Sequence, residues 1–201
     1  MSAKRSFTRA ELESFRDAEV PDLLPRDGVE GEPLRLLFVG INPGLWTAAT
    51  STHFAHPGNR FYPALLRAGI ITEPIDPAAG MTDHDRASLR RRGIGITNVV
   101  RRATARAAEL SDDELRAGGA ELADLVRRRR PRVVAIAGIT AYRTAFGRRK
   151  ATMGRQPDAL PDAGDSELWV VPNPSGLNAH ETVESLARAY AGAARAAGVI
   201  G

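Results

Sequence analysis

Two short loops of the sequence each place an asparagine before a proline, directly after a hydrophobic run. Residues 40–44 read Gly-Ile-Asn-Pro-Gly, and residues 173–177 read Asn-Pro-Ser-Gly-Leu. A residue before proline is kept out of helical geometry, so each asparagine side chain can be held in one orientation on an extended backbone. Amides held in this way can position a water molecule or a polar ligand, although they cannot usefully accept a proton near neutral pH.

Carboxylates are missing around both loops. No Asp or Glu occurs between Arg35 and Thr72, and the second loop is flanked only by Glu167, before its strand, and Glu181. A hydrolase built here must orient water with neutral groups, chiefly Asn42, and must stabilise a good leaving group, so we expect slow turnover. The alternative is that the asparagines merely fix tight turns. Two such loops at matching strand ends favour the functional interpretation.

Two features near the loops, Phe54 and Leu177, suggest a planar ligand or DNA, and a pair of histidines lies beside the first. Phe54 lies between polar residues in a loop, where it can stack on a base or equally fill the core. Leu177 at the tip of a glycine-containing loop has the form of a wedge for a base stack, although it can also fold back onto the last helix. His53 and His56 are three residues apart, but no acidic or thiolate partner lies nearby, which argues against a metal site.

Composition limits the class of protein. The chain has 201 residues and no cysteine, which excludes disulfides, cysteine nucleophiles, iron–sulfur clusters and thiolate zinc sites. The absence of a long apolar run or a signal peptide predicts a cytoplasmic protein, associated with the nucleoid in a bacterium. The net charge of +4 suggests an anionic partner such as DNA. A general bias toward arginine explains the charge equally well, because 26 of the 28 basic residues are arginine.

The elements that position these residues follow from hydrophobic pattern and capping. The expected strands are 34–41, 94–100, 132–137 and 168–171, and the expected helices are 8–15, 59–68, 83–92, 111–129, 138–146 and 180–197. Their alternation predicts an α/β domain with a mainly parallel four-stranded sheet covered by helices on both faces. Ligands bind at the carboxyl ends of such strands. We expect residues 1–32 to form an N-terminal extension and residues 33–201 to form one domain.

Four blocks of the chain resemble the mismatch-specific uracil (thymine) DNA glycosylases, the Mug/TDG branch of the uracil-DNA glycosylase superfamily. They are residues 40–45, residues 54–61, residues 95–100 and residues 173–177. Their order and spacing extend the resemblance over about residues 34–195. It implies a three-layer α/β/α sandwich with a short central sheet, and no metal or organic cofactor. It also implies removal of uracil, and more weakly of thymine or ethenocytosine, opposite guanine in duplex DNA after base flipping.

The resemblance also implies roles for individual residues. Asn42 would hold the attacking water, Phe54 would stack on the flipped base, and Asn173 would approach the glycosidic bond. The remaining implied positions are Ile41 and Gly44 for base binding, and Ser175, Gly176, Leu177 and Asn178 for the wedge that replaces the base and reads the orphan guanine. The expected contacts to the DNA backbone are Asn98, Arg101, Arg102 and His180, of which the two arginines follow the second strand.

Two positions depart from the family pattern. Ala179 stands where members often carry arginine after the wedge leucine, and residues 97–101 read Thr-Asn-Val-Val-Arg where they often read Thr-Lys-Leu-Val-Asp. We therefore expect a monomeric, monofunctional glycosylase, with no lysine near the site for a Schiff base, whose substrate range is shifted. The alternatives are a non-catalytic sensor of damaged DNA with the same fold, or a nucleoside hydrolase, against which the lack of metal-binding acids argues.

Overall fold

A five-stranded sheet forms the centre of the computed structural model, which describes residues 6–26 and 33–201. The strands lie in the order β2-β1-β3-β5-β4. Their bounds are β1 (Leu36–Gly40), β2 (Ile94–Asn98), β3 (Val133–Ala137), β4 (Gly154–Arg155) and β5 (Glu167–Val171). The first, second, third and fifth are parallel to one another, so their carboxyl ends share one edge.

The α/β class and the mainly parallel sheet are confirmed, whereas the expected number of four strands is wrong. β4 is an additional edge strand that pairs antiparallel with β5, with Gly154 opposite Val170. It contains two residues, which is too short to show a hydrophobic period that sequence reading can detect.

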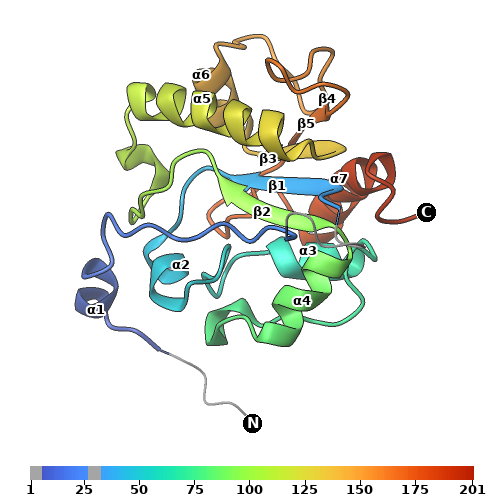
Figure 1. The fold of residues 1–201 in the computed structure, drawn as a ribbon. Coiled ribbons are helices and arrows are strands. Elements are labelled where there is room, and N and C mark those ends of the chain that lie inside the picture. Colours follow the sequence, from blue (N-terminus) through green and yellow to red (C-terminus); the bar gives the residue numbers. More distant parts are fainter. Residues whose placement is uncertain (1–5, 27–32) are drawn as a thin grey trace.

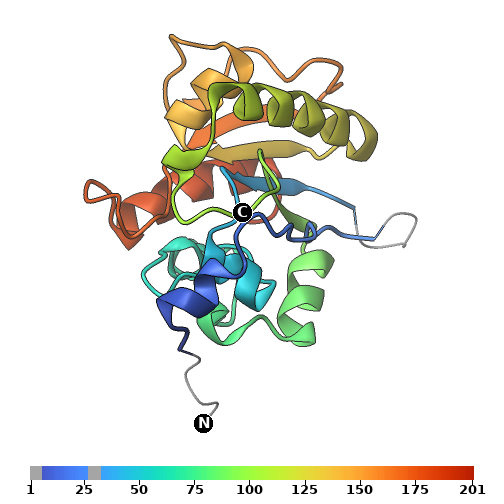
Figure 2. The ribbon, with the colours of Figure 1, turned by 90° about the vertical axis from the view of Figure 1, so that its left-hand side faces the viewer.

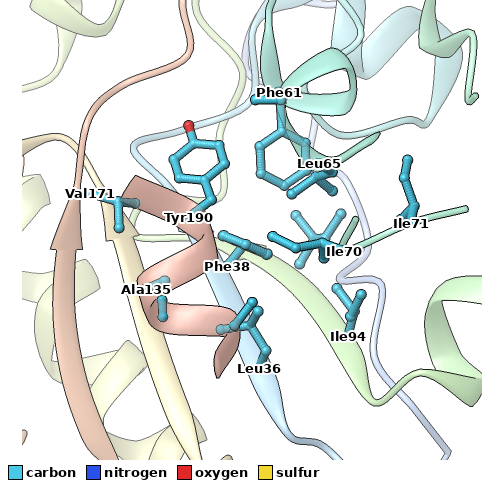
Figure 3. Close-up of a cluster of buried hydrophobic side chains, with 14 of the residues drawn as sticks. Leu36, Phe38, Phe61, Leu65, Ile70, Ile71, Ile94, Ala135, Val171 and Tyr190 are labelled. Atoms are coloured by element: carbon cyan, nitrogen blue, oxygen red, sulfur yellow. The ribbon is translucent and has the colours of Figure 1, made fainter. Parts of the chain in front are cut away.

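Helices cover both faces of the sheet (Figure 1). One face carries α5 (Asp112–Arg129) and α6 (Ile139–Phe146), and the other carries α3 (Phe61–Arg67), α4 (Asp83–Arg91) and α7 (Val183–Ala196). Successive side chains of β1 alternate between these layers. Phe38 packs with Phe61 and Tyr190 on the α3 and α7 side (Figure 3), whereas Val39 packs on the α5 and α6 side. Both faces are therefore apolar, as the near-continuous hydrophobic strands require.

Side-chain caps explain where most of the expected helices begin. Thr8 caps α1 (Arg9–Glu13), and Ser111 caps α5. The last helix is capped by Thr182, two residues beyond the expected start at His180. α2 (Leu45–Thr50) was not expected from the sequence, because its N-cap is Gly44 and no side chain caps it. Two short 3₁₀ helices complete the described elements, η1 (Pro77–Ala79) and η2 (Ala107–Glu109).

The described part of the N-terminal segment, residues 6–26, packs against the rest of the molecule. Leu23 is buried and pairs antiparallel with Ile96 of β2, with backbone hydrogen bonds of 2.9 and 2.7 Å. α1 lies beside α2 (Figure 2). The division into an extension of residues 1–32 and a domain of residues 33–201 stays a prediction, and residues 1–5 and 27–32 lie outside the described part. None of the described helices has the length and apolar character to cross a membrane.

Candidate active site

A groove with a volume of about 1210 Å³ lies at the carboxyl ends of the parallel strands. The loops that follow β1, β2 and β5 contribute to its walls, as does the loop that carries Phe54. The sequence-predicted residues that line it are Ile41, Asn42, Gly44, Phe54, Asn98, Asn173, Ser175, Gly176 and Leu177. The two asparagine-proline loops, which are more than 120 residues apart in the chain, therefore meet in one site as the sequence predicts.

The amide of Asn42 has its nitrogen fixed by protein acceptors. Its Nδ2 donates to the carbonyl oxygens of Pro43 and Arg102, at 3.1 Å each, and to Thr104 Oγ1 at 2.7 Å. Thr104 donates its own hydroxyl proton to the carbonyl of Arg106, so its oxygen must act as the acceptor toward Asn42. Asn42 Oδ1 then has no partner among the described residues. A hydrogen-bond acceptor is thus available at the groove.

Asn173 uses its amide in the opposite sense. Its Oδ1 accepts the backbone N–H of Ser175 at 2.9 Å, which closes a local turn of the kind that asparagine favours. Its Nδ2 has no hydrogen-bond partner in the described part of the chain and lies near Gly138 at the end of β3. A hydrogen-bond donor is therefore available from the second loop.

A third amide, Asn98, reaches the groove from the end of β2 and is oriented by a buried histidine. His53 Nε2 lies 3.1 Å from the carbonyl oxygen of Pro21, which can only accept, so this nitrogen carries a proton. Burial lowers the pKa of His53 and keeps the ring neutral, so Nδ1 accepts from Asn98 Nδ2 at 3.2 Å. Asn98 Oδ1 consequently lies over Gly40, where a Cβ would come within 2.4 Å of it. Asn98 thus offers an acceptor in the groove, whereas the sequence predicts a contact from this residue to the DNA backbone.

Phe54 forms an aromatic wall of the groove. Its ring stacks on Phe61 with centroids 4.1 Å apart and an interplanar angle of 26°. Its backbone φ of +56° is a left-handed conformation that is uncommon for a bulky residue and costs on the order of 1–3 kcal/mol. The stack on Phe61 sets the ring plane, so Phe54 offers one face to a planar ligand.

The second loop projects an apolar tip from the groove. Leu177 is 89% exposed, the largest exposure among the large hydrophobic side chains of the described residues. Its backbone N–H donates to Ser175 Oγ at 3.3 Å, and Asn178 Nδ2 donates to the carbonyl of Asn173 at 3.1 Å. The leucine does not fold back onto the last helix, and its place is set by the loop backbone.

The N-terminal segment and η2 also line the groove, which the sequence does not predict. In this part of the groove, Arg16 is paired to Glu13 of α1 and to Glu109 of η2. The hydrogen bond from Arg16 lowers the pKa of Glu109. Glu13 and Glu109 are the acidic residues that line the described groove, and Arg16 pairs with both of them.

Of the four expected backbone contacts, Asn98 lines the described groove, and Arg101, Arg102 and His180 do not. Arg102 pairs with Glu114 and Asp17, and these hydrogen bonds raise the pKa of its guanidinium further. Arg101 pairs with Asp22 and lines a smaller hollow of about 360 Å³ beside α5. His180 is exposed outside the groove, and Asn98 lies within it. The described residues contain no group of three His, Asp or Glu side chains arranged to hold a metal ion.

Comparison with protein families agrees with this geometry. The family model for the uracil DNA glycosylase superfamily matches residues 28–193. The chain belongs to this superfamily. The match includes both asparagine-proline loops, the loop of Phe54 and the end of β2, so it contains all the sequence-predicted residues that line the groove. Superfamily members are glycosylase hydrolases that act on DNA, and the α/β architecture found here is the one they share.

Three supports of this glycosylase site were missed by sequence reasoning. Thr104 fixes the amide of Asn42, His53 orients Asn98, and Arg60 holds the second loop. Arg60 falls inside the block of residues 54–61 and His53 directly precedes it, but their partners are distant in the chain, and nothing in the local pattern identifies them. Thr104 follows the second strand by six residues and carries no motif. Tertiary contacts alone show the function of each.

Proposed function

We propose that the protein removes uracil mispaired with guanine in duplex DNA by hydrolysing the bond between the base and its deoxyribose. The observation that carries this proposal is the pair of asparagines in one groove, with an amide oxygen free on Asn42 and an amide nitrogen free on Asn173 among the described residues. One can hold the attacking water and the other the departing base. A base within a duplex must be flipped out of the helix to reach them.

In the proposed reaction the bond from N1 of uracil to C1′ of the sugar breaks, and its electron pair leaves with the base. Negative charge spreads onto the uracil oxygens, where a hydrogen bond from Asn173 Nδ2 stabilises it. A water that donates to Asn42 Oδ1 forms the new bond to C1′, and its proton passes to solvent. Because an amide is no useful base near neutral pH, turnover is slow and depends on the leaving group.

The orientation of Asn98 supports uracil rather than cytosine as the base. Uracil carries a proton on N3, which can donate to Asn98 Oδ1. Cytosine has an unprotonated N3, whose lone pair would face that oxygen and repel it. Asn98 is therefore proposed as a base-binding residue rather than a backbone contact. Phe54 stacks on the flipped ring, and the backbone at Ile41 and Gly44 forms the adjoining pocket.

The exposed tip at Leu177 supports a wedge function. In this proposal Leu177 enters the gap that the flipped base leaves, and the loop backbone between Ser175 and Asn178 faces the orphan guanine. Arg101 and His180 remain proposed contacts to the DNA backbone, because their exposed side chains can reach its phosphates. Arg102 is a weaker candidate, since it would have to leave two carboxylates.

The product of this reaction is an abasic site in an uncut strand. No lysine lines the groove in the described part of the chain, so no amine is placed there to form a Schiff base. Thymine and ethenocytosine opposite guanine are proposed as weaker substrates, because each adds atoms to the ring that Phe54 and Asn98 must accommodate.

Base release from defined duplexes tests the proposal. Matched oligonucleotides carrying U·G, U·A, T·G or ethenocytosine·G pairs, and single-stranded uracil DNA, would be incubated with the protein and then treated to cleave abasic sites chemically. We expect release from U·G well above release from U·A. Equal release from every uracil context would retain the chemistry and reject guanine specificity. Binding to U·G without any release would reject the enzyme and favour a non-catalytic sensor of the same fold.

A further inference from the structure

Arg60 lies beneath the second loop and donates hydrogen bonds to its backbone. The backbone N–H of Arg60 donates to the carbonyl of Pro174 at 3.0 Å. Its guanidinium Nη2 donates to the carbonyls of Ser175, Gly176 and Asn178 at 3.3, 3.1 and 3.0 Å, and Nη1 donates to the carbonyl of Glu181. One residue, through its backbone N–H and its side chain, thus holds both ends and the middle of the segment 174–181.

The carbonyl cluster around Arg60 is stabilised by the positive charge of the guanidinium. Turning the chain sharply at residues 175–178 directs several carbonyl dipoles toward one point, where they would repel one another. The five N–H donors of a guanidinium fan out in one plane and can serve several acceptors at once. Among the described residues no carboxylate pairs with Arg60, and the side chain of Glu181 accepts instead from Ser185.

The loop has little other support for its tip. Gly176 packs so closely on the carbonyl oxygen of Gly58 that a Cβ there would lie at 2.6 Å, which fixes the base of the turn. Leu177 itself is 89% exposed, so its direction depends on the backbone alone. The residues that hold this backbone therefore determine whether the leucine points outward before DNA arrives.

We propose that Arg60 is a positioning residue that preorganises the loop for insertion of Leu177 into DNA. This inference rests on the proposed function, because insertion matters only if a base is flipped. A loop already held in its bound shape loses less conformational freedom on binding, so the wedge enters the base stack at lower cost. Arg60 touches neither the base nor the water in this scheme and acts through the loop.

The test compares Arg60→Met with Arg67→Met, a control that removes an exposed arginine from α3, the helix that begins directly after Arg60. We expect Arg60→Met to lower kcat/KM for U·G duplex by about 10- to 100-fold, the size of effect that a displacement of about 1 Å can produce. Release from single-stranded uracil DNA, which needs no wedge, should fall less than threefold. Equal losses on both substrates would overturn the positioning role.

A double-mutant cycle keeps the inference falsifiable if Arg60→Met is poorly folded. Arg60→Lys retains the charge with fewer donors, and it would be combined with Leu177→Ala. If Arg60 acts through Leu177, the double variant should be no slower on U·G than the slower single variant, whereas independent roles would multiply the two losses.

Amide hydrogen exchange separates failure of this inference from failure of the proposed function. In the free protein, amides of residues 175–181 should exchange faster in Arg60→Met than in Arg67→Met. Unchanged exchange with intact U·G activity would overturn the role of Arg60 alone. If the wild-type protein releases no base, the proposed function fails, and faster exchange would show that Arg60 still holds the loop without a wedge function.

Discussion

The two asparagine-proline loops share a sequence motif and a place in the sheet, yet they expose opposite ends of their amides. Asn42 gives its nitrogen to protein acceptors and leaves its oxygen at the groove. Asn173 gives its oxygen to the backbone of Ser175 and leaves its nitrogen. A groove that must hold a water and a departing anion needs an acceptor and a donor, and one residue type supplies both because its surroundings differ.

The two orientations also have different origins. The partners of Asn42 include Arg102 and Thr104, which lie 60 and 62 residues away and reach the loop through tertiary packing. The partner of Asn173 is two residues away, within the same loop. The first amide therefore depends on the folded domain, whereas the second depends chiefly on its own turn, which Arg60 then holds in place.

The largest expected effect comes from removing each amide in turn. Asn42→Ala and Asn173→Ala should each lower kcat for uracil release by on the order of 10²–10³, the usual cost of losing one polar group that stabilises a transition state. 5-Fluorouracil leaves more easily, because fluorine withdraws electrons from the ring. It should restore much of the rate of Asn173→Ala and little of that of Asn42→Ala. Equal rescue of both variants in single-turnover assays would remove the distinction between the two loops.

Substitution by aspartate should separate the loops through stability. In Asn42→Asp, a carboxylate oxygen replaces Nδ2 and faces three acceptors, and leaving such groups unsatisfied costs about 1–3 kcal/mol each. In Asn173→Asp, the oxygen that accepts from Ser175 is retained. Thermal unfolding should therefore show a clearly lower Tm for Asn42→Asp than for Asn173→Asp. The same Tm for both would mean that Asn42 depends on distant contacts no more than Asn173 does.

The positions of the loops could be predicted from the sequence, and their orientations could not. Apolar runs such as residues 34–41 identify the buried strands, and each Asn-Pro pair follows directly, so the shared strand edge follows from parallel topology. Which end of each amide is free depends on contacts such as that between Asn42 and Thr104. Such contacts join residues that are far apart in the chain, so they produce no local pattern in the sequence.

The errors have the same physical cause. β4 has two residues, and α2 begins at Gly44 without a side-chain cap, so neither shows the period or cap that a sequence reader uses. The expected contact of Asn98 to the DNA backbone stays a prediction, but the orientation of its amide at the groove could not be inferred from the sequence. The hydrogen bond that Asn98 donates to a neutral His53 orients the amide at the groove.

The third amide, that of Asn98, differs from the other two because its partner, His53, can titrate. Burial lowers the folded pKa of His53 below its ordinary value of 6.5, with smaller opposing effects from the Pro21 carbonyl and Asp22. As the pH falls, the unfolded chain therefore binds this proton at a higher pH than the folded protein does. The free energy of unfolding should decrease as the pH falls below about 6.5 toward the folded pKa. Glutamine can donate to Pro21 and accept from Asn98 without titrating. His53→Gln should thus flatten the dependence of Tm on pH between 5 and 7.

The matched control for that experiment is His56→Gln, on the same loop but exposed. It should keep the wild-type pH dependence of Tm. Uracil release should respond in parallel, because a protonated His53 would donate from Nδ1 and could no longer accept from Asn98. A wild-type pH profile in His53→Gln would show that His53 does not control the amide.

The smallest effect expected concerns the anchor of the first loop. Arg102, whose carbonyl holds Asn42, pairs with Glu114, and hydrogen bonds from Arg102 and then Ser111 lower the pKa of Glu114 to about 2. The contribution of that carboxylate is complete above its ordinary value of 4.5 and is lost as the pH falls toward 2. Because about a third of each side chain of the pair is exposed to screening solvent, Glu114→Gln at pH 7 should slow release less than about threefold. Amide exchange at residues 102–104 should increase while that at residues 173–177 stays unchanged. A change in the second loop instead would show that the two loops share one support, contrary to the separate origins of their contacts.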